Sequence, residues 1–224
     1  MIQILVLIGS LAALVAARRH RRHRPPTPAR AVIVSPRRST VIAEDGAVRS
    51  AQSAKISCPR DELTRLWTGE NLENLAATYW RFLSRVTLGI VRVVYGVGER
   101  RVVLIAQPLT LLRFESPDYL LEPGHGKVSW RIKGGLLVAR RGRGAGYLAL
   151  DVTRLQDDEV SGQGTARIEV EVANFYPSIA TGFSTPVYEA TQSALHVLVT
   201  HAFLRSLARL ELARSRVGRL RAEL

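Results

Sequence analysis

Residues 128–152 read VSWRIKGGLLVARRGRGAGYLALDV, and this stretch decides the fold class. Short runs of β-branched, leucine and aromatic residues alternate in it with glycine-rich turns. The runs are Val128–Ile132, Leu136–Ala139 and Tyr147–Val152, and the turns are Gly134-Gly135 and Gly142–Gly146. Short apolar runs that meet at glycine turns are typical of antiparallel hairpins. The stretch therefore predicts an antiparallel sheet rather than strand–helix–strand units.

The same pattern extends over residues 88–172. Further runs are Ile90–Tyr95, Arg101–Ile105, Leu109–Phe114, Tyr119–Leu121 and Ala166–Val172. The last of these alternates apolar and charged residues, as a strand with one buried face does. Thr40–Ile42 is predicted as an edge strand, and residues 39–60 are otherwise weakly patterned.

Helical spacing flanks the strands on both sides. Asp61–Trp67 is a short candidate helix, and Thr68 is a plausible N-cap for a longer one. Apolar residues then recur with helical period at Leu72, Leu75, Ala76, Tyr79, Phe82, Leu83 and Val86. The expected solvent side holds Glu70, Asn71, Glu73, Asn74, Arg81 and Arg85. A final helix is predicted from Pro186 to about Arg214, with an almost wholly apolar section at Ala194–Leu204.

The predicted order is two helices, about six antiparallel strands and a long C-terminal helix, which is an α+β arrangement. It resembles the START-like or polyketide-cyclase-like helix-grip superfamily, in which a curved antiparallel sheet wraps a long C-terminal helix. The resemblance covers roughly residues 40–214. It implies a cavity between sheet and helix that holds a hydrophobic ligand. If the sheet and the C-terminal helix pack solidly, without an apolar pocket of at least ~300 Å³, this ligand-binding hypothesis fails.

The N-terminus predicts a membrane anchor. Met1–Ala17 carries no charged side chain, and dense positive charge follows at Arg18, Arg19, Arg21, Arg22 and Arg24. Seventeen helical residues span about 26 Å, near the lower limit for crossing a bilayer. A cleaved signal peptide and a buried helix are the alternatives, but signal peptides place their positive charge before the apolar run. The arginines are expected to contact lipid headgroups and to place the following domain in the cytoplasm, with the N-terminus outside.

The chain divides into an anchor over residues 1–17, a basic proline-rich linker over 18–38, a domain over 39–214 and a basic tail over 215–224. The net charge of +13 belongs mostly to the two ends: residues 1–43 carry +8, residues 205–224 carry +4, and residues 44–204 carry only +1. The folded part therefore gives no reason to expect nucleic acid as a partner. One cysteine, Cys58, cannot form an intramolecular disulfide.

Aromatic and polar residues suggest a ligand site without identifying a reaction. The candidate liners are Trp130, Tyr147, Tyr176, Tyr188, Gln192 and His196, of which the last three belong to a polar stripe on the C-terminal helix. That stripe also fits an ordinary solvent face, and the aromatics also fit a packed core. The loop Arg140–Gly146 fits a turn, with a surface contact to lipid phosphate as the alternative. The sequence has no Cys/His cluster of the kind that would predict a metal site, and no cofactor is expected.

These features predict a membrane-anchored cytoplasmic domain that binds a hydrophobic small molecule or a lipid. Two other functions stay open. The apolar section Ala194–Leu204 would also suit a homo-oligomer or another protein partner at the membrane. A cyclase- or hydratase-type enzyme, with His196 as acid or base, is the third hypothesis.

Overall fold

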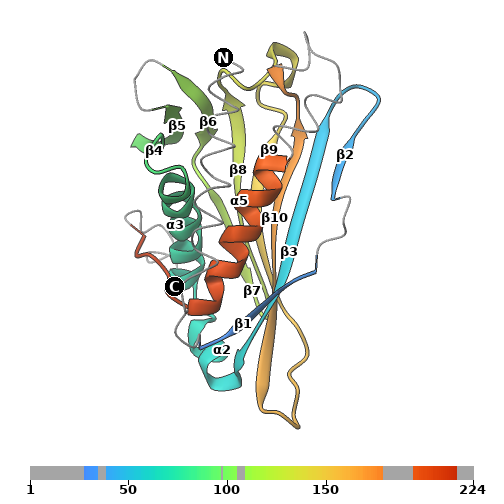
Figure 1. Cartoon of the computed structure of the whole chain (residues 1–224), viewed down its shortest axis with the longest axis vertical. Coiled ribbons are helices and arrows are strands. Elements are labelled where there is room, and N and C mark those ends of the chain that lie inside the picture. Colours follow the sequence, from blue (N-terminus) through green and yellow to red (C-terminus); the bar gives the residue numbers. More distant parts are fainter. Residues whose placement is uncertain (1–27, 35–38, 97, 105–108, 179–193, 216–224) are drawn as a thin grey trace.

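The computed structural model describes residues 28–34, 39–96, 98–104, 109–178 and 194–215. This part holds ten strands, three α-helices and two short 3₁₀ helices (Figure 1). The strands are β1 (Arg30–Ile33), β2 (Thr40–Ile42), β3 (Val48–Pro59), β4 (Val91–Gly96), β5 (Glu99–Leu104), β6 (Thr110–Glu115), β7 (Asp118–Glu122), β8 (His125–Gly134), β9 (Tyr147–Arg154) and β10 (Gln163–Phe175). The helices are α2 (Arg60–Leu66), α3 (Gly69–Val86) and α5 (Ala194–Ser206), with 3₁₀ turns η1 (Arg140–Gly142) and η4 (Leu207–Arg209). The predicted α+β class with an antiparallel sheet is confirmed.

The strands form one sheet in the order β1-β3-β10-β9-β8-β6-β5-β4, with β2 also paired to β3 and β7 to β8. β3 is a 12-residue strand near one edge that the sequence did not predict. Its inward positions include Ser50 and Gln52, which are buried although polar, so the apolar alternation that marks a strand is missing there. β3 pairs with β10 from Gln163↔Pro59 to Val172↔Ser50. Its extended conformation therefore depends on pairing with a distant segment and not on a local sequence pattern.

β1 lies inside the segment that the sequence assigned to a linker. It pairs with β3 from Arg30↔Ser57 to Ile33↔Ala54. The Ala29 N–H also donates to the Ala208 carbonyl oxygen at 3.1 Å. Residues 29–33 therefore belong to the folded domain.

The predicted hairpin at Gly134-Gly135 is wrong. The chain after Gly135 does not turn back along β8 but runs beside β6, where the Leu136 N–H donates to the Thr110 carbonyl oxygen at 3.0 Å. A Cβ atom at Gly135 would lie 2.3 Å from the Leu111 carbonyl oxygen, so this close approach requires glycine. Leu136–Ala139 is consequently a turn that leads into η1, and β9 is the next strand.

α3 and α5 cover the same face of the sheet (Figure 1). Rings from both helices and from two strands meet between these layers. Trp80 of α3 packs edge-to-face on Phe114 at 5.2 Å and on Trp130 at 5.1 Å between ring centroids. Tyr79 does the same with Trp80 and with Phe203 of α5, each at 5.2 Å. These buried rings fill the centre of the interior between the sheet and the two helices.

α3 follows the prediction in its cap and in its apolar face. The Thr68 side chain accepts the Asn71 N–H at 3.2 Å, and the predicted core residues from Leu72 to Phe82 are buried. Two residues expected on the solvent side, Glu73 and Asn74, are buried instead. The reason for Asn74 is the C-terminal segment, which crosses α3 and donates the Ser215 N–H to the Asn74 Oδ1 atom at 2.7 Å.

The C-terminal helix is shorter than predicted. α5 ends at Ser206, η4 follows, and Leu210 adopts a left-handed backbone with φ 54°, so the helix does not continue to Arg214. The predicted start at Pro186 lies outside the described residues. The membrane anchor at residues 1–17 lies outside them too. Within the described ranges, no helix combines the length and the apolar character needed to cross a bilayer.

Candidate functional site

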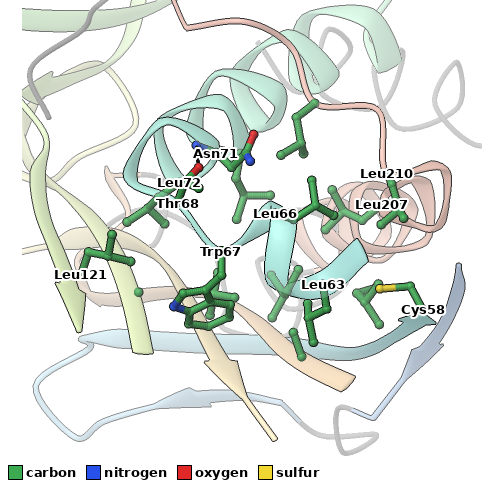
Figure 2. Close-up of a pocket in the computed structure, with 17 residues that line it drawn as sticks. Cys58, Leu63, Leu66, Trp67, Thr68, Asn71, Leu72, Leu121, Leu207 and Leu210 are labelled. Carbon is green, nitrogen blue, oxygen red and sulfur yellow. Dashed lines mark hydrogen bonds between the residues drawn. The ribbon is translucent and has the colours of Figure 1, made fainter. Parts of the chain in front are cut away.

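An apolar pocket lies between the sheet and the α2–α3 corner. α2 lies toward the lower end of the molecule in Figure 1. Its volume is about 100 Å³, and it is partly open to solvent. Figure 2 shows Cys58 and Leu63 on one side and Leu121 on the other, with Trp67 between them. Segments far apart in the sequence supply the walls, including Ile56 and Cys58 of β3, Ala166 and Ile168 of β10, and Leu207, Leu210 and Leu212 after α5.

A missing side chain on β8 leaves this space. The inward row of β8 is Gly126, Val128, Trp130 and Ile132, of which the last three are large and almost fully buried. A Cβ atom at Gly126 would lie 3.5 Å from Leu121 and 3.6 Å from Leu72, which are ordinary contact distances. The glycine is therefore not required by crowding. It leaves a gap at the end of a row that is otherwise filled.

The corner between α2 and α3 provides the few polar atoms of the pocket. Trp67 ends α2, and Thr68 caps α3, so both side chains are fixed beside the opening. The Trp67 indole N–H is buried and has no hydrogen-bond partner among the described residues. A buried donor without an acceptor is costly, and a ligand whose acceptor atom reached this N–H would satisfy it.

Cys58 is the one titratable side chain in the lining, and its thiol is not activated. Burial, together with the nearby Glu62 carboxylate, raises the pKa of Cys58 above its ordinary value. The thiolate is the nucleophilic form, so this cysteine stays protonated and unreactive at neutral pH. The described lining therefore offers binding surface rather than an acid, a base or a nucleophile.

The structure does not bring the predicted ligand residues together at this pocket. Trp130 is fully buried, but among the rings of the packed centre. Tyr147 is on the opposite face of the sheet, where its hydroxyl donates to the Glu171 Oε2 atom at 3.1 Å. The Tyr176 hydroxyl donates to the Asp45 Oδ2 atom at 2.6 Å, and its ring lies under the Arg141 guanidinium at 5.3 Å.

The remaining predicted residues lie largely outside the described part. Tyr188 and Gln192 fall within 179–193, and the headgroup arginines Arg18, Arg19, Arg21, Arg22 and Arg24 fall within 1–27. His196 belongs to α5 by its backbone, and its side chain is not among those described.

A buried arginine is the main polar feature that sequence reasoning missed. Arg100 of β5 is 6% exposed, and its Nε and Nη1 atoms have no hydrogen-bond partner among the described residues. Its guanidinium lies 5.2 Å from the Tyr95 ring and 5.8 Å from the Trp130 ring, as in cation–π contacts. Burial raises the pKa of the neighbouring Tyr119, and the charge of Arg100 opposes that shift. The alternation of β5 places residue 100 inward, which is the signal that could have revealed it.

A second buried polar group joins α5 to β3. The His201 Nε2 atom lies 2.7 Å from the Gln52 Oε1 atom, and the Gln52 amide donates to the Ser39 hydroxyl. Burial and then the charge of Arg205 lower the pKa of His201. A neutral imidazole that donates from Nε2 fits this arrangement. Within the described residues, no three His, Cys, Asp or Glu side chains gather as metal ligands would.

Comparisons with known proteins add only distant likenesses. No family model matches the chain, and no curated protein sequence matches it. Among solved structures, it is similar to a conserved protein of unknown function from Enterococcus faecalis, with 10% identity and a TM-score of 0.32 over 82% of this chain and 84% of that one. It is also similar to truncated norcoclaurine synthase from Thalictrum flavum, with 12% identity and a TM-score of 0.33 over 72% and 94%.

Norcoclaurine synthase from Thalictrum flavum in complex with dopamine and hydroxybenzaldehyde gives 13% identity and a TM-score of 0.28, over 74% of this chain and 88% of that one. Similarities at this level carry no argument about function.

Proposed function

We propose that this domain binds an apolar group, such as a single aromatic ring or the end of an acyl chain, in the pocket beside Gly126. The observation that carries the proposal is an apolar, partly open space of about 100 Å³ lined by side chains of the sheet and of the helices. Well-packed domains hold few voids larger than a water molecule, and apolar cavities of roughly 150 Å³ bind benzene.

The pocket, at about 100 Å³, does not reach the ~300 Å³ expected for a whole hydrophobic ligand enclosed between sheet and helix, so it does not meet that expectation. The ligand would therefore place only one apolar end inside and leave its remainder at the opening. Trp67 would orient that ligand through its free indole N–H. The absence of any carboxylate or histidine from the described lining favours binding over catalysis.

Toluene binding to the full chain in detergent, followed by ligand-observed NMR, tests the proposal. Gly126→Val would fill the gap and abolish binding. Ala51→Val is the matched control, because it adds side-chain volume to β3 on the face that points away from Gln52 and the interior. Equal binding by both variants and the natural chain would place the toluene elsewhere and refute the proposal.

Trp67→Phe tests the role of the indole N–H. This change keeps an aromatic ring and removes the donor. Acetophenone, which adds a carbonyl acceptor to a ring of similar size, is expected to lose about 5-fold in affinity, because one hydrogen bond contributes about 1 kcal/mol. Toluene is expected to bind Trp67→Phe as it binds the natural chain. An equal loss for both compounds would show that Trp67 acts only through its shape.

We also propose that residues 1–17 hold this domain at a membrane, with the N-terminus outside and the domain in the cytoplasm. The support is the apolar run followed by five arginines, which favour the cytoplasmic side. A ligand with an apolar end would then be available from the bilayer. A reporter that is active only in the cytoplasm, fused to the C-terminus, is expected to be active. A silent but fully expressed reporter would contradict this orientation.

The protein-partner hypothesis has less support. Val199, Phe203 and Leu204 of α5 are buried against the rest of the domain, and Leu198 is 38% exposed. Val199, Phe203 and Leu204 thus form part of the core, and Leu198 is the exposed one of these four. These residues do not offer a continuous apolar face for a second protein.

A further inference from the structure

A second hollow, unrelated to the apolar pocket, lies on the outer face of the sheet over β5, β6 and the turn after β8. Its volume is about 370 Å³. Its charged lining residues are Glu99, Arg101, Arg113 and Arg143. β5 and β6 lie at the upper left in Figure 1, whereas α2, which contributes to the apolar pocket, lies toward the lower end. We call this hollow the arginine groove.

The strand register places two of its three arginines, Arg101 and Arg113, in one row. Arg101 of β5 stands directly opposite Arg113 of β6, and Arg113 stands opposite Gly134 of β8. Neighbouring strands lie about 4.8 Å apart, so these three backbone positions span about 10 Å. The inward neighbours Arg100, Val102 and Phe114 are buried, which confirms that Arg101 and Arg113 point to the outer face.

Arg143 completes the row from a different segment. It belongs to the turn between η1 and β9, and that turn is fixed by the Gly144 N–H, which donates to the Ile132 carbonyl oxygen at 2.9 Å. A Cβ atom at Gly134 would lie 3.6 Å from the Arg143 Cγ and Cδ atoms. Because Gly134 has no side chain, the Cγ and Cδ atoms of Arg143 can lie next to it.

Neighbouring acids offset only one of the three arginines in this row. The Arg101 Nε atom lies 3.3 Å from the Glu99 Oε1 atom, although the angles do not make it a hydrogen bond. Glu115 pairs with Arg131 at 3.8 Å. Arg113 and Arg143 are exposed and have no ion pair among the described residues. The four charged residues of the lining therefore carry a net charge of +2.

Like charges placed directly opposite on adjacent strands destabilise a sheet, so an arrangement of Arg101 against Arg113 calls for a counter-charge. A phosphate group carries about −1.5 to −2 at neutral pH and offers several oxygen acceptors. Guanidinium forks match those oxygens in pairs. A concave site with a net charge of +2 and two unpaired guanidinium groups complements such an anion in both charge and geometry.

We propose that the arginine groove is a phosphate-binding site. Arg113 and Arg143 bind the oxyanion, and Arg101 lies beside Arg113 and adds positive charge to the site. The phosphate comes either from a lipid headgroup or from a free phosphate compound, because the two present the same oxyanion. The phosphate site shares no lining residue with the apolar pocket. The proposal of a phosphate site therefore does not depend on whether the apolar pocket binds a ligand.

Calorimetric titration of the full chain in detergent with pyrophosphate, and separately with phosphatidylglycerol or phosphatidylcholine in mixed micelles, tests the site. The double variant Arg113→Ala/Arg143→Ala is expected to weaken binding at least roughly 10-fold, since a hydrogen bond to a charged group contributes about 1.5–3 kcal/mol. The matched control is Arg81→Ala/Arg85→Ala, which removes the same charge from exposed positions of α3. The control is expected to bind as the natural chain does. The N-terminal arginines are present in every variant, so their attraction to lipid cancels.

Arg113→Lys/Arg143→Lys keeps the charge and removes the guanidinium fork, and an intermediate affinity is expected. A loss confined to pyrophosphate would identify a free phosphate compound as the ligand, and a loss confined to the phospholipids would identify a headgroup. The proposal is overturned if the groove variant and the α3 control bind alike, or if the natural chain binds none of these compounds. Unchanged thermal unfolding of the unliganded variants would verify that each of them is folded.

Discussion

Gly126→Ala is expected to stabilise the unliganded protein while it weakens ligand binding. The new methyl group would lie 3.5 Å from Leu121 and 3.6 Å from Leu72, in contact with both and in conflict with neither. Burying one methyl group contributes about 0.8 kcal/mol. Replacing glycine by alanine where the backbone permits it adds about 0.4–1 kcal/mol by restricting the unfolded chain.

Together these terms give an increase of about 1–2 kcal/mol in the free energy of unfolding. For a domain of this size that corresponds to about 2–8 °C in Tm. Thermal unfolding of the full chain in detergent, followed by near-UV circular dichroism, measures the shift. Toluene affinity is expected to fall in the same variant, because the methyl group occupies part of the space.

Two results would refute this reasoning. A lower Tm would mean that the walls around Gly126 are closer than the structure shows. A higher Tm with unchanged toluene affinity would mean that the gap exists but that the ligand binds elsewhere.

Three further predictions concern the elements that frame the sites. Phe203→Ala is expected to lower the free energy of unfolding by about 3–5 kcal/mol in urea titrations, since it removes a fully buried ring, whereas Leu198→Ala on the exposed side of α5 should cost much less. Thr68→Ala is expected to cost about 1 kcal/mol by removing the N-cap of α3, and Thr68→Asp should retain most of that stability. Because the folded protein lowers the pKa of His201, the unfolded chain takes up the proton first as the pH falls below about 6.5, so stability should decrease between pH 7.5 and pH 5.5. His201→Gln should flatten this pH dependence, and an identical slope in both proteins would exclude His201 as its cause.

The elements that the sequence predicted well are those whose residues carry their own pattern. α3 has an apolar face, a threonine cap and a length that needs no partner to be recognised. β10 alternates Ile168, Val170 and Val172 with charged residues, so its buried face is visible in the sequence alone. β3 lacks such a signal because Ser50 and Gln52 occupy buried positions, and their burial depends on partners that only the fold supplies.

The candidate sites were harder to predict, for a physical reason. Hydrophobic periodicity tells which face of an element is buried, and says nothing of where packing is incomplete. The aromatic residue Trp130 was expected to line a cavity, but its ring packs against Trp80 and closes the space instead. The pocket arises where Gly126 contributes no side chain and where Leu207 and Leu210 arrive from the end of the chain. None of these residues is distinctive in the sequence.

Net charge misled in a similar way. Residues 44–204 carry only +1, yet this nearly neutral stretch contains the whole arginine groove. The register between β5 and β6 puts Arg101 opposite Arg113 and Glu99 opposite Glu115, so equal numbers of charges separate into neighbouring rows of opposite sign. The local electrostatic field depends on such placement and not on the net charge of the stretch.

Because the groove and the apolar pocket have no lining residue in common and lie at different ends of the sheet, their variants should act independently. Combining Gly126→Ala with Arg113→Ala/Arg143→Ala should therefore change toluene and pyrophosphate binding by the same factors as the separate variants, and a departure from additivity would show that the two sites communicate through β8.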